Sequence, residues 1–171
     1  MSHAIISKNE ASRITNIEAL KLAAKEMGLD FRVCEPRRGH YRTYKDDNGG
    51  NWVGDWDLPE GVSGKQMGDN ADFVISIPLK DDPSGKCYEL GIVWDEKDQC
   101  WYPAYDFWNR GGGLEKHIGK VKLQGKKVIS ACPKMMEYYR LMEVGIKQRA
   151  LGKNVVFQNN KQEQKLVLCI Q

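Results

Sequence analysis

The sequence predicts an α+β fold, a single domain in which an antiparallel β-sheet packs with two main α-helices. Two segments have the apolar periodicity of amphipathic helices, one toward each end of the chain, and the segments between them alternate apolar and polar residues as strands do. Glycine and proline separate these segments. The expected order is β-α-β-β-β-β-β-α-β-β, and 171 residues are enough to bury one core.

The first helix is predicted between Ile14 and Gly28, after a short strand at His3–Ser7. Thr15 precedes Glu18 by three residues, the spacing of a capping box in which each side chain satisfies a backbone N–H group at the helix start. The apolar face consists of Ile17, Leu20, Ala24 and Met27. Gly28 ends the helix because glycine tolerates the left-handed backbone conformation.

Five strands are expected between the two helices: Asp30–Glu35, Gly39–Lys45, Ala71–Lys80, Tyr88–Trp94 and Gln99–Trp108. The first two form a hairpin, and the last two form another around the acidic turn DEKD. In the third, apolar side chains share one face: Phe73, Ile75, Ile77 and Leu79. Six glycines lie between residues 46 and 70, a composition that predicts a long loop.

The second helix is predicted to begin at Pro133, a favoured first-turn residue, and to end at Gly152. Glu143 and Lys147 have the spacing of an i,i+4 ion pair. Its apolar stripe consists of Met135, Tyr139, Met142, Ile146 and Ala150. These features predict a helix that covers the sheet.

Two further segments complete the predicted fold. The chain closes with a hairpin formed by Val155–Gln158 and Lys165–Ile170 around a polar turn. The glycine- and lysine-rich segment before the second helix is expected to be irregular, with one helical turn from Leu114 to Gly119.

Composition and charge narrow the function classes. Hydrophobic residues make up 41% and charged residues 29% of the chain, which is typical of a globular protein. The net charge of +3 is too small to indicate nucleic-acid binding by itself, so any basic surface must come from local clustering. No apolar run reaches the length of a membrane span, and we expect no secretory leader. We therefore expect a cytoplasmic protein without membrane contact.

The five cysteines do not form a metal or redox motif. They are Cys34, Cys87, Cys100, Cys132 and Cys169, with no two closer than thirteen residues. A zinc site or a redox-active pair is therefore not indicated, and an odd number is typical of reduced thiols. No cofactor is expected.

Several segments occur in an order that resembles a known family. They are the initial MSH, a helix ending in MGLD, the strand ADFVI, the hairpin YELGIVWDEKDQCWYPAYDFW and the final YYRLMEVGIKQRALGKNVVFQNNKQEQKLVLCI. The chain resembles, from end to end, the hypothetical chloroplast open reading frame family whose domain has no established function. This family occurs in plastid genomes, cyanobacteria, other bacteria and phages. The resemblance implies a small cytosolic α+β protein of bacterial or phage origin, and it implies no catalytic residues.

Residues 43–70 and 111–131 depart from this resemblance as insertions, so a specialised role is expected there. The first insertion continues a segment in which cationic and aromatic side chains alternate. The candidate ligand-binding residues of this segment and of the first insertion are Arg37, Arg38, His40, Tyr41, Arg42, Tyr44, Trp52 and Trp56. Cations can neutralise phosphate, and each base stacked on an aromatic ring contributes about 1–3 kcal/mol. The alternative is an edge hairpin whose arginines prevent aggregation and whose aromatic residues favour a strand.

The second insertion contains RGGGLEKHIGK, with Lys116, His117 and Lys120 as further candidate ligand-binding residues. Backbone N–H groups at a helix start attract anions, and glycines precede the expected helical turn. The lysine spacing is not that of a phosphate-binding P-loop. A flexible connector with solvated lysines is the alternative.

Three functions remain open from the sequence. The first is a non-enzymatic protein that binds a phosphate-bearing ligand, namely a nucleotide, a nucleotide-derived signal or single-stranded nucleic acid, for example a phage protein that sequesters such a signal. The second is a protein–protein interaction module, either an accessory subunit or an inhibitor of a larger machine. The third is a small metal-dependent hydrolase using Asp55, Asp57 or Asp69 with His40. Exposed tryptophans also allow a homo-oligomer.

Overall fold

The computed structural model describes residues 4–6, 8–33, 71–83, 87–106, 108–125, 127–160 and 165–171. The helices in these ranges are α1 (Ile17–Glu26), α2 (Glu115–Ile118) and α3 (Pro133–Ala150), with 3₁₀ turns η1 (Glu10–Ser12) and η3 (Trp108–Gly113). The strands are β1 (Ala4–Ile6), β2 (Asp30–Val33), β3 (Ala71–Ser76), β4 (Leu90–Asp95), β5 (Cys100–Asp106), β6 (Lys122–Gln124), β7 (Lys127–Ser130), β8 (Val155–Asn160) and β9 (Lys165–Ile170). The predicted α+β class is confirmed.

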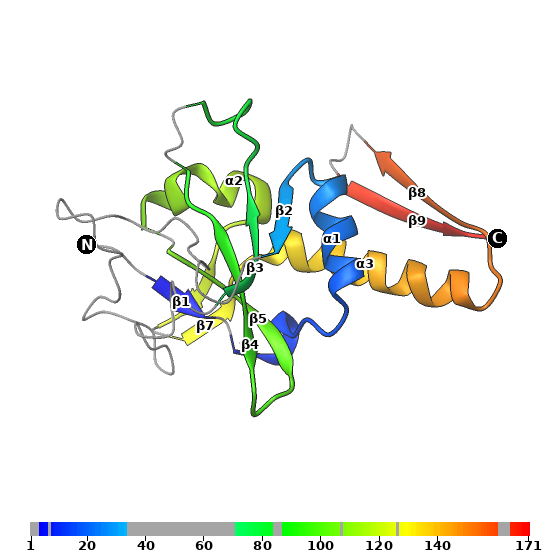
Figure 1. Ribbon diagram of the computed structural model, residues 1–171, viewed down its shortest axis with the longest axis horizontal. Coiled ribbons are helices and arrows are strands. Elements are labelled where there is room, and N and C mark those ends of the chain that lie inside the picture. The colour runs from blue at the N-terminus through cyan, green and yellow to red at the C-terminus, as the bar shows by residue number, and fades with distance from the viewer. Residues whose placement is uncertain are drawn as a thin grey trace.

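Five strands form an antiparallel sheet in the order β1-β5-β4-β3-β2. The helices α1 and α3 lie together on one face of this sheet (Figure 1). The paired residues Ile75 and Leu90 point to that face and are fully buried beneath the helices. On the other face, Val74 and Ala104 belong to a second, smaller apolar cluster. Both faces of the central strands are therefore buried.

A row of aromatic rings runs across the helix-covered face. Phe31 stacks on Phe73 with ring centroids 5.4 Å apart, and Phe73 meets the edge of Trp101 at 5.9 Å. Trp101 in turn contacts Trp94 at 4.6 Å. The indole N–H of Trp101 donates to the carboxylate of Asp72 at 2.7 Å, which satisfies a half-buried polar group. One carboxylate from the aspartate-rich part of the sequence therefore has a structural partner.

The start of α1 differs from the prediction. Asn16, and not Thr15, is the N-cap, and its side-chain oxygen accepts a hydrogen bond from Ala19 N at 3.1 Å. The helix begins one residue later than predicted, because Ile14, which precedes Thr15, exchanges backbone hydrogen bonds of 3.0 and 2.9 Å with Trp101. Gly28 follows the helix with a positive φ of 69°, as predicted.

The long helix α3 matches its predicted bounds. Met135, Tyr139 and Met142 are buried against the core, whereas Ala150 is exposed beyond the end of the sheet. The predicted ion pair is present, with Lys147 Nζ 3.6 Å from Glu143 Oε1. Apolar burial therefore follows the predicted stripe except at its last residue.

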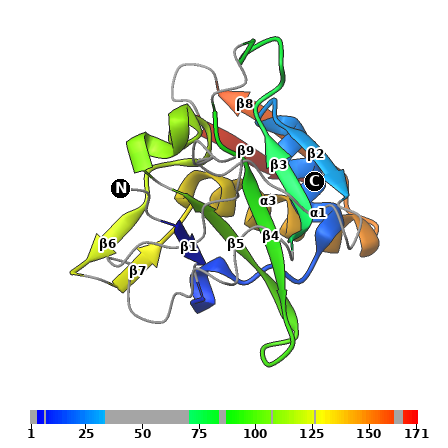
Figure 2. The same ribbon diagram turned by 60° about the vertical axis from the view of Figure 1, so that its left-hand side comes forward.

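Three expectations about the strands are corrected. The strand β3 ends at Ser76, because Pro78 begins a turn in which its carbonyl accepts from Asp81 N at 2.8 Å. Leu79, predicted to share the apolar face of that strand, is 71% exposed in the turn. The strands β6 and β7 form a separate hairpin in a segment predicted to be irregular (Figure 2).

The C-terminal hairpin is confirmed as the antiparallel pair β8–β9, a separate two-stranded sheet beside α3 (Figure 1). Gly145 of α3 lies beneath Phe157, and a Cβ atom on this glycine would stand 2.5 Å from Phe157 Cζ. The close approach of helix and hairpin therefore requires glycine. The predicted strand Gly39–Lys45 lies outside the described residues. Within the described ranges, no helix combines the length and apolarity needed to cross a membrane.

Candidate anion-binding site

The predicted ligand-binding residues fall into two groups. Eight lie outside the described residues: Arg37, Arg38, His40, Tyr41, Arg42, Tyr44, Trp52 and Trp56. The aspartates proposed for a hydrolase, Asp55, Asp57 and Asp69, also lie outside them. Lys116, His117 and Lys120 are described and lie on or just after α2. The site is therefore built from this second group.

Glycines before α2 form a left-handed turn. Residues Arg110, Gly111, Gly112 and Gly113 have φ values of 58°, 62°, 59° and 113° in sequence, a conformation that glycine adopts without the steric cost borne by other residues. The carbonyl of Gly111 accepts hydrogen bonds from Leu114 N and Tyr88 N. A Cβ atom on Gly113 would stand 3.2 Å from Cys87 Sγ. The glycines thus allow a tight turn and close packing beside Cys87.

Buried contacts fix the position of α2. Leu114 and Ile118 are fully buried, and Glu115 is 8% exposed. The Glu115 Oε1 atom accepts a hydrogen bond from Val121 N at 3.3 Å and lies 3.3 Å from the hydroxyl oxygen of Tyr105. The Tyr105 hydroxyl donates to the backbone carbonyl of Ala131. Because these residues anchor the short helix, the exposed Lys116 and the half-buried His117 are held on its outer side.

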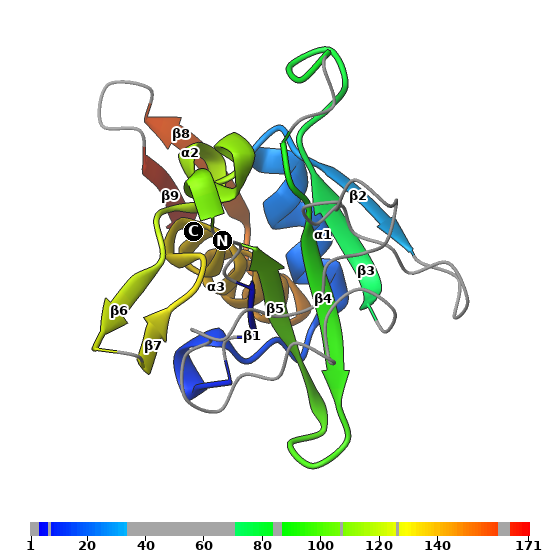
Figure 3. The ribbon, with the colours of Figure 1, turned by 90° about the vertical axis from the view of Figure 1, so that its left-hand side faces the viewer.

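Gly119 brings the end of α2 against the beginning of α3. Its φ is 91°, and a Cβ atom there would lie 2.8 Å from Lys134 N and 2.9 Å from Pro133 Cγ. Any other residue would push the two helices apart. Figure 3 views the molecule from the end at which α3 begins and shows α2 beside it. This junction places Lys134 near His117, a neighbour that the spacing of these residues in the sequence does not indicate.

The charges around His117 oppose its protonation. Burial of the imidazole lowers the pKa of His117 below its usual value of 6.5, and the positive charges of Lys134 and Lys116 lower it further. The negative charge of Asp81, in the turn after β3, partly opposes them. His117 is therefore neutral at pH 7, with two ammonium groups near enough to affect its titration.

The three lysines of this region form no ion pair with the described residues, whereas two cations elsewhere in the fold do. Lys8 lies 2.7 Å from Asp95, and Arg32 lies 2.7 Å from Glu89. By contrast, within the described ranges, no carboxylate lies within 4.0 Å of the ammonium nitrogen of Lys116, Lys120 or Lys134. We call Lys116, His117 and Lys134 the basic cluster.

The basic cluster has the chemistry of an anion site. The two ammonium groups can pair with an oxyanion, although the charge of Asp81 opposes them, and a neutral imidazole can donate one hydrogen bond to it. Lys120 is exposed just beyond α2. Among the described residues, no three histidine, cysteine or acidic side chains are placed to hold a metal ion. The described cysteines Cys87, Cys100, Cys132 and Cys169 carry free thiols.

Comparisons with known proteins give no match: no protein-family model, curated protein or solved structure is similar to this chain. The resemblance to the plastid open reading frame family therefore stays a prediction. The function of the chain must accordingly be inferred from the geometry of its described residues.

Proposed function

We propose that this chain is a binding protein for a phosphate-bearing ligand and that the basic cluster holds the phosphate. The observation that carries the proposal is the junction at Gly119, which brings Lys134 of α3 to the end of α2 that carries Lys116 and the half-buried His117. Neither lysine forms an ion pair with the described residues. Like charges held together destabilise a fold, and a bound oxyanion removes that repulsion. The free energy that this repulsion costs the unbound protein is therefore recovered when the anion binds.

The ligand classes that fit are a nucleotide, a nucleotide-derived signal and single-stranded nucleic acid. Each carries phosphate for the lysines and a base for the aromatic residues predicted to stack it, which include Tyr41, Tyr44, Trp52 and Trp56. Arg37, Arg38 and Arg42 would add charge to the same surface. A phage or bacterial protein that sequesters a signalling nucleotide is one form of this function.

The test is a binding titration with three probes: adenosine triphosphate, a cyclic dinucleotide and a rhodamine-labelled oligothymidylate. We expect Lys116→Gln and Lys134→Gln each to weaken binding about tenfold or more, because a hydrogen bond to a charged group contributes about 1.5–3 kcal/mol. For the oligothymidylate, each substitution is expected to reduce the log–log salt slope by about 0.7.

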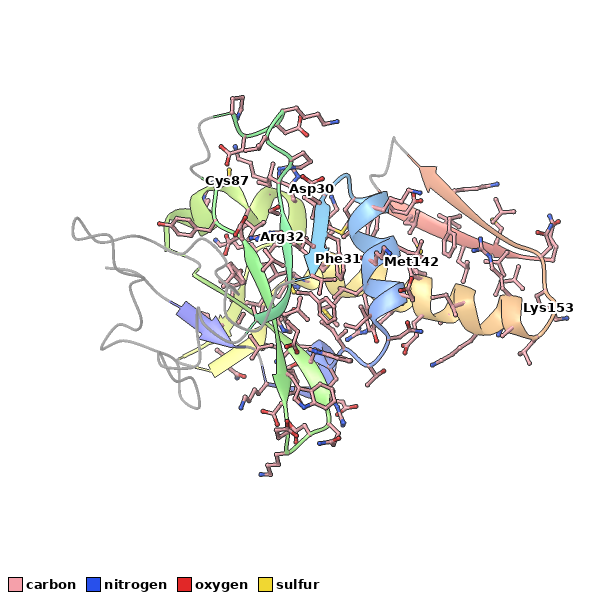
Figure 4. All side chains as sticks on the ribbon, in the orientation of Figure 1. Asp30, Phe31, Arg32, Cys87, Met142 and Lys153 are labelled. Atoms are coloured by element: carbon pink, nitrogen blue, oxygen red, sulfur yellow. The ribbon has the colours of Figure 1, made fainter. Side chains whose placement is uncertain are left out.

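The matched control is Lys153→Gln, an exposed lysine at the opposite end of α3 from Cys87 and α2 (Figure 4). This variant removes the same charge from the chain and leaves the basic cluster intact. Equal affinity in all three variants, or no binding of any probe by the unmodified protein, contradicts the proposal.

A second candidate function is a protein–protein interaction module, and a different surface favours it. Val156 and Val167 lie on the face of the β8–β9 hairpin that points away from α3 and are 42% and 43% exposed. Leu151, just after α3, is 71% exposed. If this surface binds a protein, one dominant partner should co-purify with the chain and be lost from a Val156→Lys, Val167→Lys double variant, while phosphate binding is retained.

A further inference from the structure

We propose that the basic cluster takes up its phosphate-bearing ligand together with one proton on His117, so that the ligand binds more tightly as the pH falls. This inference rests on the proposed function and adds a form of regulation to it. It begins from the position of His117 on α2, where Gly119 holds it against the first turn of α3.

Three charged groups lie on the elements packed around His117, and Gly119 brings one of these elements, the first turn of α3, against α2. Lys116 lies on the same helix, Lys134 lies on the first turn of α3, and Asp81 lies in the turn after β3. Two of these three are cations, and burial acts in the same direction as the cations. In the free protein these effects keep the imidazole neutral.

A bound oxyanion reverses this balance. Its negative charge offsets those of Lys116 and Lys134 and favours the imidazolium form of His117, which then has two N–H donors. Ligand binding and protonation are therefore coupled, and the coupling is reciprocal. If the anion raises the pKa of His117, a lower pH must raise the affinity for the anion.

The size of the effect is limited to one proton. Affinity should rise by at most about tenfold for each pH unit, over the interval between the free and the bound pKa of His117. Above the bound pKa, protonation of this residue should no longer make the affinity vary with pH. The ligand must not titrate in the same interval, because the second pKa of a phosphate monoester is about 6.

Two probes meet this condition, sulfate and a rhodamine-labelled oligothymidylate, whose phosphodiesters stay singly charged. Proton NMR of the imidazole signals gives the pKa of His117 in the free protein and at saturating sulfate, and His117→Gln assigns the signal. We expect the pKa to rise when sulfate binds. In the free protein, Lys134→Gln should also raise it, because one opposing charge is removed.

The second measurement is oligothymidylate affinity from pH 5.5 to 8.0, a range chosen around the usual histidine pKa of about 6.5. The unmodified protein should bind more tightly at the acid end. His117→Gln should bind as the unmodified protein does at pH 8.0 and lose the His117-dependent part of the slope. If binding is present but both the slope and the pKa of His117 are unaffected by the probes, this inference is wrong and the proposed function stands. If neither probe binds at any pH, both are wrong.

Discussion

The cationic side chains at the two ends of α3 differ in their contacts and in their interaction with the helix dipole. At its C-terminal end, the guanidinium group of Arg149 donates to the carbonyl of Val155 at 3.1 Å and lies 5.4 Å from the ring centroid of Phe157. A cation there also complements the negative end of the helix dipole. At its N-terminal end, Lys134 opposes the dipole and has Lys116 as an electrostatic neighbour of the same histidine.

This difference separates a charge that contacts other parts of the fold from a charge that does so less. Arg149 contributes to the junction between helix and hairpin, whereas Lys134 makes no comparable contact in the described structure. Departures from local stability rules concentrate at functional sites. The comparison therefore favours the beginning of α3 over its end as the proposed ligand site, and substitutions at each end can test this proposal.

The largest expected effect on stability is that of a substitution at Gly119, where α2 meets α3. Gly119→Ala should destabilise the protein by about 3 kcal/mol, because the residue has a positive φ and the added Cβ would meet the backbone of α3. Chemical denaturation measures this change. The control is Gly152→Ala, which has a φ of 77° with nothing near the added atom and should cost only about 1 kcal/mol. Equal losses would mean that the junction tolerates displacement.

At the other end of α3, Phe157→Ala should destabilise the protein by about 2 kcal/mol, below the range for fully buried phenylalanines because this ring is only half-buried. It removes the contacts with Gly145 and Arg149. Val156→Ala, one residue away on the outward face, should change stability by at most about 0.5 kcal/mol. Neither variant should alter phosphate affinity, and a loss of affinity in Phe157→Ala would show that the two ends are coupled.

Charge reversal at the two ends should change stability with opposite signs. Lys134→Glu should stabilise the protein by about 0.5–1 kcal/mol, since it complements the helix dipole and relieves repulsion, and it should weaken phosphate binding. Lys147→Glu should destabilise by a similar amount, because it loses the pair with Glu143 and opposes the dipole. Thermal and chemical denaturation at low salt measure both. A destabilising Lys134→Glu would show that Lys134 supports the fold.

The smallest expected effect is the pH dependence of stability due to His117. Its pKa is lower in the folded than in the unfolded chain, so the unfolded chain binds more protons between the two values. This contribution to stability is present above the unfolded pKa of about 6.5 and is lost as the pH falls toward the folded pKa. His117→Gln should remove this part of the pH profile. An unchanged profile between pH 5 and 7 would count against the burial of the imidazole, since about 6.5 is its unperturbed value.

Much of the fold could be predicted from local pattern. The spacing of Met135, Tyr139 and Met142 predicts the buried face of α3, because this period reports which side chains meet the core. The acidic turn DEKD between two strand-like segments predicts the central hairpin. Capping was less predictable. Thr15 and Asn16 are both good caps, and the β-bridge of Ile14 to Trp101 decides between them. A long-range contact of this kind leaves no local signal.

For the candidate site, the sequence by itself determined that Lys116, His117 and Lys120 share a glycine-rich segment with basic character. Only the tertiary structure decided that Lys134 joins them. The physical reason is the junction at Gly119, where two helices meet at a distance that excludes a Cβ atom. Charge clustering depends on distance in space, and this contact is what sets that distance.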